Sequence, residues 1–374
     1  MKPKIPCILT ASLLMTRLCL GQAEAPVEDW KPAASNQPGK EYPKVNSERR
    51  VKFRIVAPGA TNVGVTFRDS SAFTKGEDGA WYGHTRPLDE GFHYYQIKID
   101  GAEVSDPNSL MFFGAMRWGS AVEIPAQDQA FYTLKNVPQG QLREVYFFSK
   151  STDSMRRAFI YTPPGYDQNA DQRYPVLYLQ HGWGENEYGW GAQGRAREIM
   201  DNLIAENKTR PFIIVMIYGM TNEIRMGGLK DFDIRPFETV LVKELIPFVD
   251  AQFRTLPDQP HRAMAGLSMG AMETKTVTLR NLDTFSHIGL FSGGSIAVTN
   301  ITDMAAFKAK NQLVFVSYGS RELGGNRGGD PKANVEALRE AGINSHFYVS
   351  PDTAHEWQSW RRSLREFAPL LFKP

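Results

Sequence analysis

The stretch "HRAMAGLSMGAMETKT", residues 261–276, joins an apolar run to a segment that could be helical, and it places Ser268 between two glycines. In a G-x-S-x-G elbow a strand turns sharply into a helix, and the glycines let the backbone close around an exposed nucleophilic hydroxyl. The pattern is short enough to occur by chance. The rest of the chain therefore has to decide between a nucleophile and an ordinary turn.

The second half of the chain, from about residue 139, alternates between two kinds of segment. Apolar runs of strand length alternate with segments of helical period, which predicts a mostly parallel sheet covered by helices on both faces. Ligand sites in such sheets gather at the carboxyl ends of the strands. The expected strands lie within 174–182, 211–219, 261–268, 285–294, 312–320 and 345–350, and the expected helices within 197–207 and 237–253.

The first half has a different texture, with short alternating runs such as "VKFRIVAP" and "HYYQIKIDG" separated by Pro-Gly and Asp-Gly signals. This spacing predicts a small all-β sandwich over 48–138, ahead of an α/β domain over 139–374. Residues 26–47 carry several prolines among polar residues, and we expect an extended leader there without a core.

The N-terminus has the features of an export signal. Lys2 and Lys4 precede a mostly apolar stretch, and a small-x-small pattern ends at Ala25, so residues 1–25 are predicted to be a cleaved signal peptide. The protein is then expected to be secreted or periplasmic. Both cysteines lie in this segment, which excludes cysteine catalysis and disulfides from the mature chain.

Charge excludes two classes of partner. The full chain has 43 basic and 41 acidic residues, and removal of the signal peptide leaves it close to neutral. Capture of nucleic acid or of an anionic membrane calls for a basic patch, so neither partner is expected.

Three chemically complementary side chains follow apolar runs of the second half. Ser268 follows the third run, Glu322 directly follows "VFVSYGS", and His355 lies between the last run and a terminal helix. A serine hydroxyl needs a histidine to take its proton, and the histidine needs a carboxylate to fix its tautomer. The order serine, acid, histidine is that of the α/β-hydrolases. Asp330, farther along a glycine-rich loop, remains the alternative acid.

Attack of the serine on an ester would create a negatively charged oxygen, which needs hydrogen-bond donors. The candidate donors are the backbone N–H groups of Met269 and of Trp183 in "HGWG". Trp190, Met226 and Trp357 lie on segments expected near the mouth and are candidates for the lining of an apolar acyl slot. No metal and no organic cofactor is required.

With these residues in place, the second half resembles the esterase D-like, or carbohydrate esterase family 1, enzymes, which include feruloyl and acetylxylan esterases. The resemblance covers about residues 145–374 and rests on "YPVLYLQHGWGENEYGW", "KELIPFVDAQFR", "AGLSMGAMET", "FSHIGLFSGG" and "GINSHFYVSPDTAHEW". Residues 48–125 resemble the early-set sandwich of the carbohydrate-binding module family 48 type, in which Trp81 and Trp118 would be candidate sugar platforms.

The resemblance implies an α/β-hydrolase fold with nucleophile Ser268, base His355 and oxyanion donors at Trp183 and Met269. The family often has aspartate where this chain has Glu322. The implied activity is the release of hydroxycinnamate from feruloylated arabinoxylan by a secreted esterase, through an acyl-enzyme.

Three alternatives stay open. An acetylxylan esterase would use the same machinery with a smaller acyl pocket. A siderophore esterase would favour a basic mouth, for which Arg225 and Arg235 are the candidates, although the chain is nearly neutral. A non-catalytic glycan-binding protein on a decayed hydrolase scaffold would not need the serine, acid and histidine together. The sequence leaves the oligomeric state undetermined.

Overall fold

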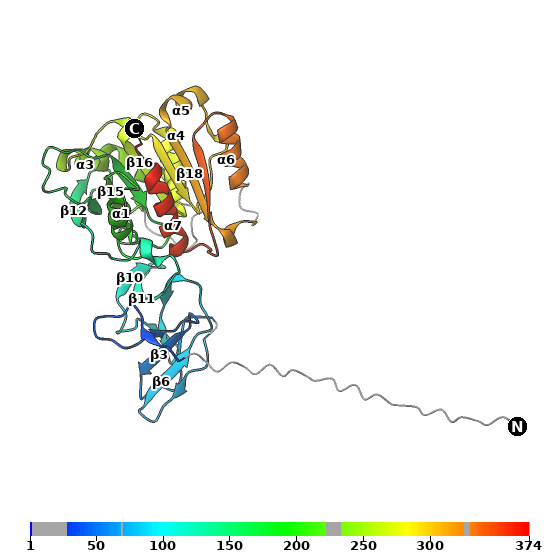
Figure 1. Ribbon diagram of the computed structural model, residues 1–374. Helices are drawn as coiled ribbons and strands as arrows, with labels where there is room; N and C mark the ends of the chain where they lie inside the picture. The colour runs from blue at the N-terminus through cyan, green and yellow to red at the C-terminus, as the bar shows by residue number, and fades with distance from the viewer. Residues whose placement is uncertain (2–27, 69, 222–232, 325–329, 374) are drawn as a thin grey trace.

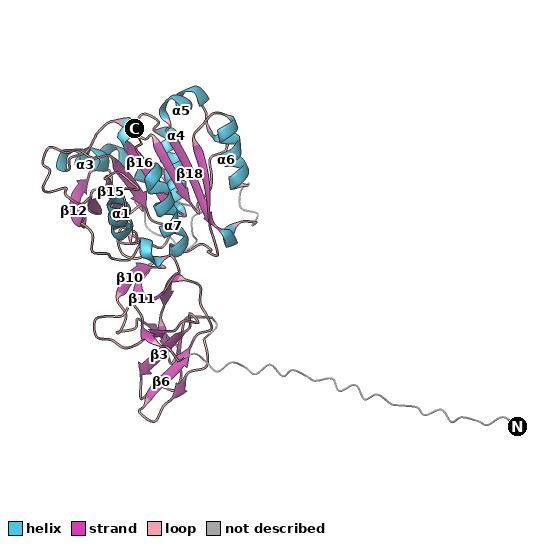
Figure 2. Cartoon of the chain, viewed as in Figure 1, coloured by secondary structure: helices cyan, strands magenta, loops and turns pink. Residues whose placement is uncertain are grey.

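The computed structural model describes residues 1, 28–68, 70–221, 233–324 and 330–373. The chain forms a smaller all-β part and a larger part in which helices cover a sheet, and Figures 1 and 2 show the two stacked end to end. The predicted signal peptide, apart from its first residue, lies outside the described ranges. Within those ranges, none of the helices combines the length and the apolar character that crossing a bilayer requires.

The all-β part consists of antiparallel sheets around one apolar cluster. In β3 (Val51–Val56) alternate residues are buried, because successive side chains of a strand point to opposite faces. Val51, Phe53 and Ile55 thereby meet Val122 of β11 (Arg117–Ile124) in the cluster. The sheets have the orders β1-β2-β3-β6-β5, β10-β11-β7 and β4-β8-β9. The remaining strands are β4 (Val63–Val65), β5 (Thr74–Lys75), β6 (Ala80–His84), β7 (Gly91–Tyr95), β8 (Ile97–Ile99), β9 (Ala102–Val104) and β10 (Met111–Gly114).

The expectation that residues 26–47 contribute nothing to a core is wrong within the described residues 28–47. Two short strands, β1 (Lys31–Pro32) and β2 (Lys44–Val45), extend the sheet at its edge next to β3. Ala33 and Val45 are buried in the apolar cluster of this part. Prolines are compatible with such edge strands, where the missing N–H faces no ladder partner, so the proline content did not exclude folded structure.

The larger part is built on an eight-stranded sheet of order β12-β13-β15-β14-β16-β17-β18-β19. The six strands from β15 to β19 in this order are parallel, as expected for the second half, and the α/β class is confirmed. An antiparallel hairpin, which the apolar runs did not reveal, extends one edge. The strands are β12 (Gln141–Ser149), β13 (Ser154–Thr162), β14 (Val176–Gln180), β15 (Ile213–Ile217), β16 (Arg262–Leu267), β17 (His287–Phe291), β18 (Leu313–Gly319) and β19 (Ser345–Ser350).

The parallel strands feed two separate layers of core. In β14, Leu177 and Leu179 pack on one face and Val176 and Tyr178 on the other. Helices α1 and α7 cover the first face, and the other helices pack on the second. The helices are α1 (Ala196–Ala205), α2 (Arg235–Thr239), α3 (Ile246–Gln252), α4 (Met269–Arg280), α5 (Met304–Lys310), α6 (Pro331–Glu340) and α7 (Trp357–Phe367), with a π-helical turn at Val240–Leu245 between α2 and α3.

The two parts share a continuous interface rather than a thin linker. Phe92 and Phe112 of the all-β part belong to the same apolar cluster as Trp357 of α7. Within this contact Arg361 of α7, which is fully buried, donates two hydrogen bonds to the carboxylate of Glu123 in β11, at 2.7 and 3.0 Å. Because a buried charge needs a compensating partner, this ion pair fixes the two parts against one another.

Candidate active site

Ser268 occupies the turn between β16 and α4. Its φ of 52° and ψ of −113° lie outside the regions that ordinary residues adopt, so the turn is strained. The flanking glycines are required by space, since a Cβ on Gly266 would lie 2.4 Å from the backbone of Gly270. Ser268 is partly exposed while its two neighbours are buried. The elbow therefore presents one hydroxyl at the carboxyl end of a central strand.

Glu322 and His355 form a hydrogen-bonded pair at the same edge of the sheet. Glu322 follows β18, and its Oε1 lies 2.7 Å from Nδ1 of His355. Its other oxygen accepts hydrogen bonds from the Ser292 hydroxyl at 2.7 Å and from the Gly319 N–H at 2.8 Å. Burial alone would raise the pKa of Glu322, but the hydrogen bonds from His355, Ser292 and Gly319 outweigh it, and the net pKa lies below the ordinary value. The carboxylate is thus ionised and oriented.

Asp330, the alternative acid, lies at the N-terminus of α6. Its side chain accepts a hydrogen bond from the Lys332 N–H and caps the N-terminus of α6. The structure therefore pairs His355 with Glu322 and gives Asp330 a local role.

The strand end that carries Ser292 brings the serine elbow and the histidine loop together. The N–H of Ser268 donates to the carbonyl of Phe291 at 2.8 Å, and the next residue, Ser292, holds the carboxylate that contacts His355. The structure shows no direct hydrogen bond between the described side chains of Ser268 and His355. Such contacts are often long without substrate and tighten when it binds.

The loop after β14 lies against the elbow. A Cβ on Gly182 would lie 2.5 Å from the Leu267 side chain and 3.4 Å from Cβ of Ser268. His181 is buried, and its Nε2 accepts a hydrogen bond from the Gly219 N–H at 3.0 Å. Burial lowers the pKa of His181 to about 4, so this ring is neutral and serves to shape the loop.

The candidate oxyanion donors fall on this loop and on the helix start. Met269 is the first residue of α4, where the N–H has no intrahelical acceptor. Trp183 follows Gly182 in the loop beside the elbow. Both backbone groups thus belong to segments that adjoin the hydroxyl of Ser268.

The predicted lining residues require a correction. Trp190 and Trp357 are 1% and 2% exposed, and their rings pack edge to face at 5.5 Å. Because both indoles are enclosed by the core, they support the site from behind and do not face a ligand directly. Met226 lies outside the described residues.

The all-β part contacts the loop after β14, which carries the candidate oxyanion donor Trp183, and the sequence did not predict this contact. The N–H of Met116, at the tip of the β10–β11 hairpin, donates to the carbonyl of Gly184 at 2.8 Å. Beside this contact, Tyr94 of β7 donates to Oε1 of Glu185 at 3.0 Å, and the Gln193 amide donates to the Tyr94 hydroxyl at 2.6 Å. Only the position of Glu185 in "HGWGENE", next to the expected oxyanion loop, hinted at this network.

The two tryptophans considered as sugar platforms differ in exposure. Trp118 of β11 is 48% exposed and lies edge to face with Tyr188, at 5.3 Å between ring centroids. Trp81 of β6 packs against the apolar cluster and donates to the Ala57 carbonyl. The sugar-platform role and the early-set assignment both stay predictions.

Comparison with known proteins agrees with this geometry. Residues 149–324 match the family described as "Putative esterase". The chain is 47% identical over 357 residues to an endo-1,4-beta-xylanase/feruloyl esterase of Xylanibacter ruminicola, a match that covers 93% of this chain and 48% of the relative. The chain thus spans about half the length of that curated relative.

Solved structures with the same fold include other esterases. A ferulic acid esterase is 26% identical with a TM-score of 0.52, covering 63% of this chain and 98% of that one. The enterobactin esterase of Shigella flexneri is 17% identical with a TM-score of 0.61, covering 86% of this chain and 92% of that one, a likeness of fold alone. The chain therefore carries a domain of this esterase family on an α/β-hydrolase fold.

Proposed function

We propose that this protein is an exported feruloyl esterase that releases hydroxycinnamate from feruloylated xylan through an acyl-enzyme. The observation that carries the proposal is the 2.7 Å contact between Glu322 and His355 at the strand ends beside the strained Ser268 elbow. The substrate class follows from the name of the Xylanibacter ruminicola relative and of the ferulic acid esterase structure.

The proposed first step is attack by the Ser268 hydroxyl on the ester carbonyl. The Glu322 carboxylate accepts a hydrogen bond from Nδ1–H of His355, which keeps the proton on Nδ1 and leaves Nε2 with a lone pair to take the serine proton. A bond forms between Oγ of Ser268 and the carbonyl carbon, and the negative charge moves to the carbonyl oxygen. The backbone N–H groups of Met269 and Trp183 are the proposed donors to that oxygen.

In the proposed second half of the reaction, the imidazolium of His355 returns its proton to the sugar oxygen as the C–O bond breaks. Water then loses a proton to His355 and attacks the acyl-enzyme, and Ser268 regains its hydrogen as the free acid leaves. Glu322 stays ionised throughout and stabilises the imidazolium.

The test is hydrolysis of methyl ferulate by the full chain, compared with 4-nitrophenyl acetate. We expect ferulate release, and Ser268→Ala should abolish nearly all turnover of both esters while the thermal unfolding curve stays unchanged. Strong acetate turnover without ferulate release would point instead to an acetylxylan esterase. Activity that survives in Ser268→Ala would remove this serine from the reaction.

A further inference from the structure

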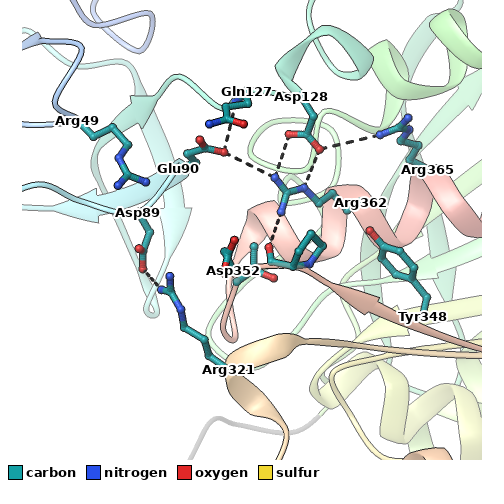
Figure 3. Close-up of a pocket in the computed structure, with 12 residues that line it drawn as sticks. Arg49, Asp89, Glu90, Gln127, Asp128, Arg321, Tyr348, Asp352, Arg362 and Arg365 are labelled. Carbon is teal, nitrogen blue, oxygen red and sulfur yellow. Dashed lines mark hydrogen bonds and ion pairs between the residues drawn. The ribbon is translucent and has the colours of Figure 1, made fainter.

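A cavity of about 580 Å³ lies between the two parts of the chain, apart from the Ser268 elbow. Figure 3 shows residues of the all-β part on one side and residues of α7 and of the loop after β19 on the other. Asp352 and Thr353 of this wall directly precede the segment with His355, and Arg321 is next to Glu322. The cavity thus shares two loops with the candidate catalytic residues.

Some arginines of the cavity form ion pairs with its carboxylates, and one does not. Arg321 pairs with Asp89, and Arg362 pairs with Asp128 at 2.8 Å. The side chain of Arg49 makes no ion pair and no hydrogen bond with any described residue, although four carboxylates line the same cavity. Its guanidinium therefore remains available as a two-pronged donor for a carboxylate ligand.

The opposite wall offers acceptors and an aromatic surface. Asp352 is exposed and makes no ion pair with any described residue, so its carboxylate can accept hydrogen bonds from ligand hydroxyls. The half-buried ring of Tyr348 adds an apolar face on which a sugar ring can pack. Arg49 and Asp352 also share positive φ values of 63° and 54°, an uncommon backbone conformation outside glycine.

A neighbouring space enlarges the room available to a ligand. A second cavity of about 480 Å³ is lined by Arg49, Glu90 and Gln127, all of which also line the first. The two spaces therefore share the cation of Arg49, the carboxylate of Glu90 and the amide of Gln127. A lining with one unpaired cation beside several acceptors suits an extended ligand that carries one carboxylate and several hydroxyls.

We propose that this groove between the two parts binds a saccharide that carries a carboxylate, that is, a hexuronic acid residue on an oligosaccharide, with the carboxylate on Arg49 and sugar hydroxyls on Asp352. The inference rests on the proposed function for the xylan backbone of the ligand. It goes beyond that function by assigning a second binding site. This site would bind a hexuronic acid branch of the polysaccharide, whereas the Ser268 site would bind the ester.

The test uses the full chain with Ser268→Ala, so that no ester is turned over, and isothermal titration calorimetry. The probes are a xylo-oligosaccharide with one glucuronic acid branch and the neutral xylo-oligosaccharide of the same length. We expect the acidic probe to bind at least about tenfold more tightly, because a hydrogen bond to a charged group is lost in the neutral one. The preference should shrink as salt is added.

The variant Arg49→Gln should abolish the preference for the acidic probe. Arg54→Gln, which removes an arginine of the same part that pairs with Asp78 outside the groove, should keep it. Equal binding of the two probes, binding of neither, or a preference that survives Arg49→Gln would overturn the inference. Because binding is measured without turnover, failure of the feruloyl esterase assay leaves this result unaffected, and the reverse also holds.

Discussion

Replacing Glu322 by glutamine tests the proposed mechanism most sharply, because the structure dictates how the amide must sit. The Gly319 N–H and the Ser292 hydroxyl both donate to Oε2 of Glu322. A backbone N–H cannot become an acceptor, so the amide oxygen of the glutamine has to stay on that side. The amide NH2 then faces Nδ1 of His355, 2.7 Å away in the parent protein.

That arrangement selects the wrong tautomer of the histidine. Nδ1 must accept from the amide, so Nε2 carries the hydrogen and cannot take the proton of Ser268. The same tautomer error in a serine protease lowers kcat by about 10⁴-fold. We expect a loss of about 10³- to 10⁴-fold in kcat for Glu322→Gln, which corresponds to about 4 to 5.4 kcal/mol in the activation free energy.

The assay is steady-state hydrolysis of methyl ferulate at neutral pH, with thermal unfolding of each variant as the check on folding. The matched control is Asp330→Asn, which should leave turnover and stability nearly unchanged because asparagine caps a helix as well as aspartate does. A loss of less than about tenfold for Glu322→Gln, or an equal loss for Asp330→Asn, would refute the tautomer argument.

Three further outcomes are expected. Burial raises the pKa of Glu185 to about 8 from 4.5, so the folded state holds a proton that the unfolded chain releases; stability should fall as pH rises through this window, by up to about 1.4 kcal/mol per pH unit, and urea titrations should find a flatter profile in Glu185→Gln. Glu123→Ala should cost about 3 to 5 kcal/mol in the same titrations, since Arg361 is left buried and unpaired; a cost below about 1 kcal/mol would contradict the role given to this pair. Gly270→Ala should lower kcat by about 10²- to 10³-fold, because the new Cβ would lie 2.5 Å from the His181 carbonyl oxygen and displace the loop that carries the candidate oxyanion donor Trp183; an unchanged kcat would argue against a role for that loop.

Much of the α/β part could be predicted because its signals are local. Each parallel strand is buried on both faces, so it reads as a continuous apolar run, and β14 and β15 lie inside the predicted ranges. The hairpin β12–β13 was missed because the edge strand β12 is largely exposed and β13 is buried only in its second half, so neither strand reads as a continuous apolar run.

The candidate site was only partly predictable, for a physical reason. Position after a strand suggested Glu322, and the structure pairs it with His355. Burial depends instead on contacts between distant segments. The sequence around Trp190 and Trp357 does not distinguish a buried tryptophan from an exposed one, yet the two rings pack on one another inside the core. The contacts of Met116 and Tyr94 with the oxyanion loop join residues far apart in the chain, and no local pattern encodes them.

The buried pair of Arg361 and Glu123 also has a consequence for gene rearrangements that separate the two parts. A gene rearrangement that moved the larger part alone would remove the partner of Arg361 and expose the apolar residues of the interface to water, whereas moving both parts preserves the pair. In the longer Xylanibacter ruminicola relative the match runs through 93% of this chain, across both parts. We therefore expect a recombinant fusion that keeps both parts intact to preserve the pair, with its boundary outside both.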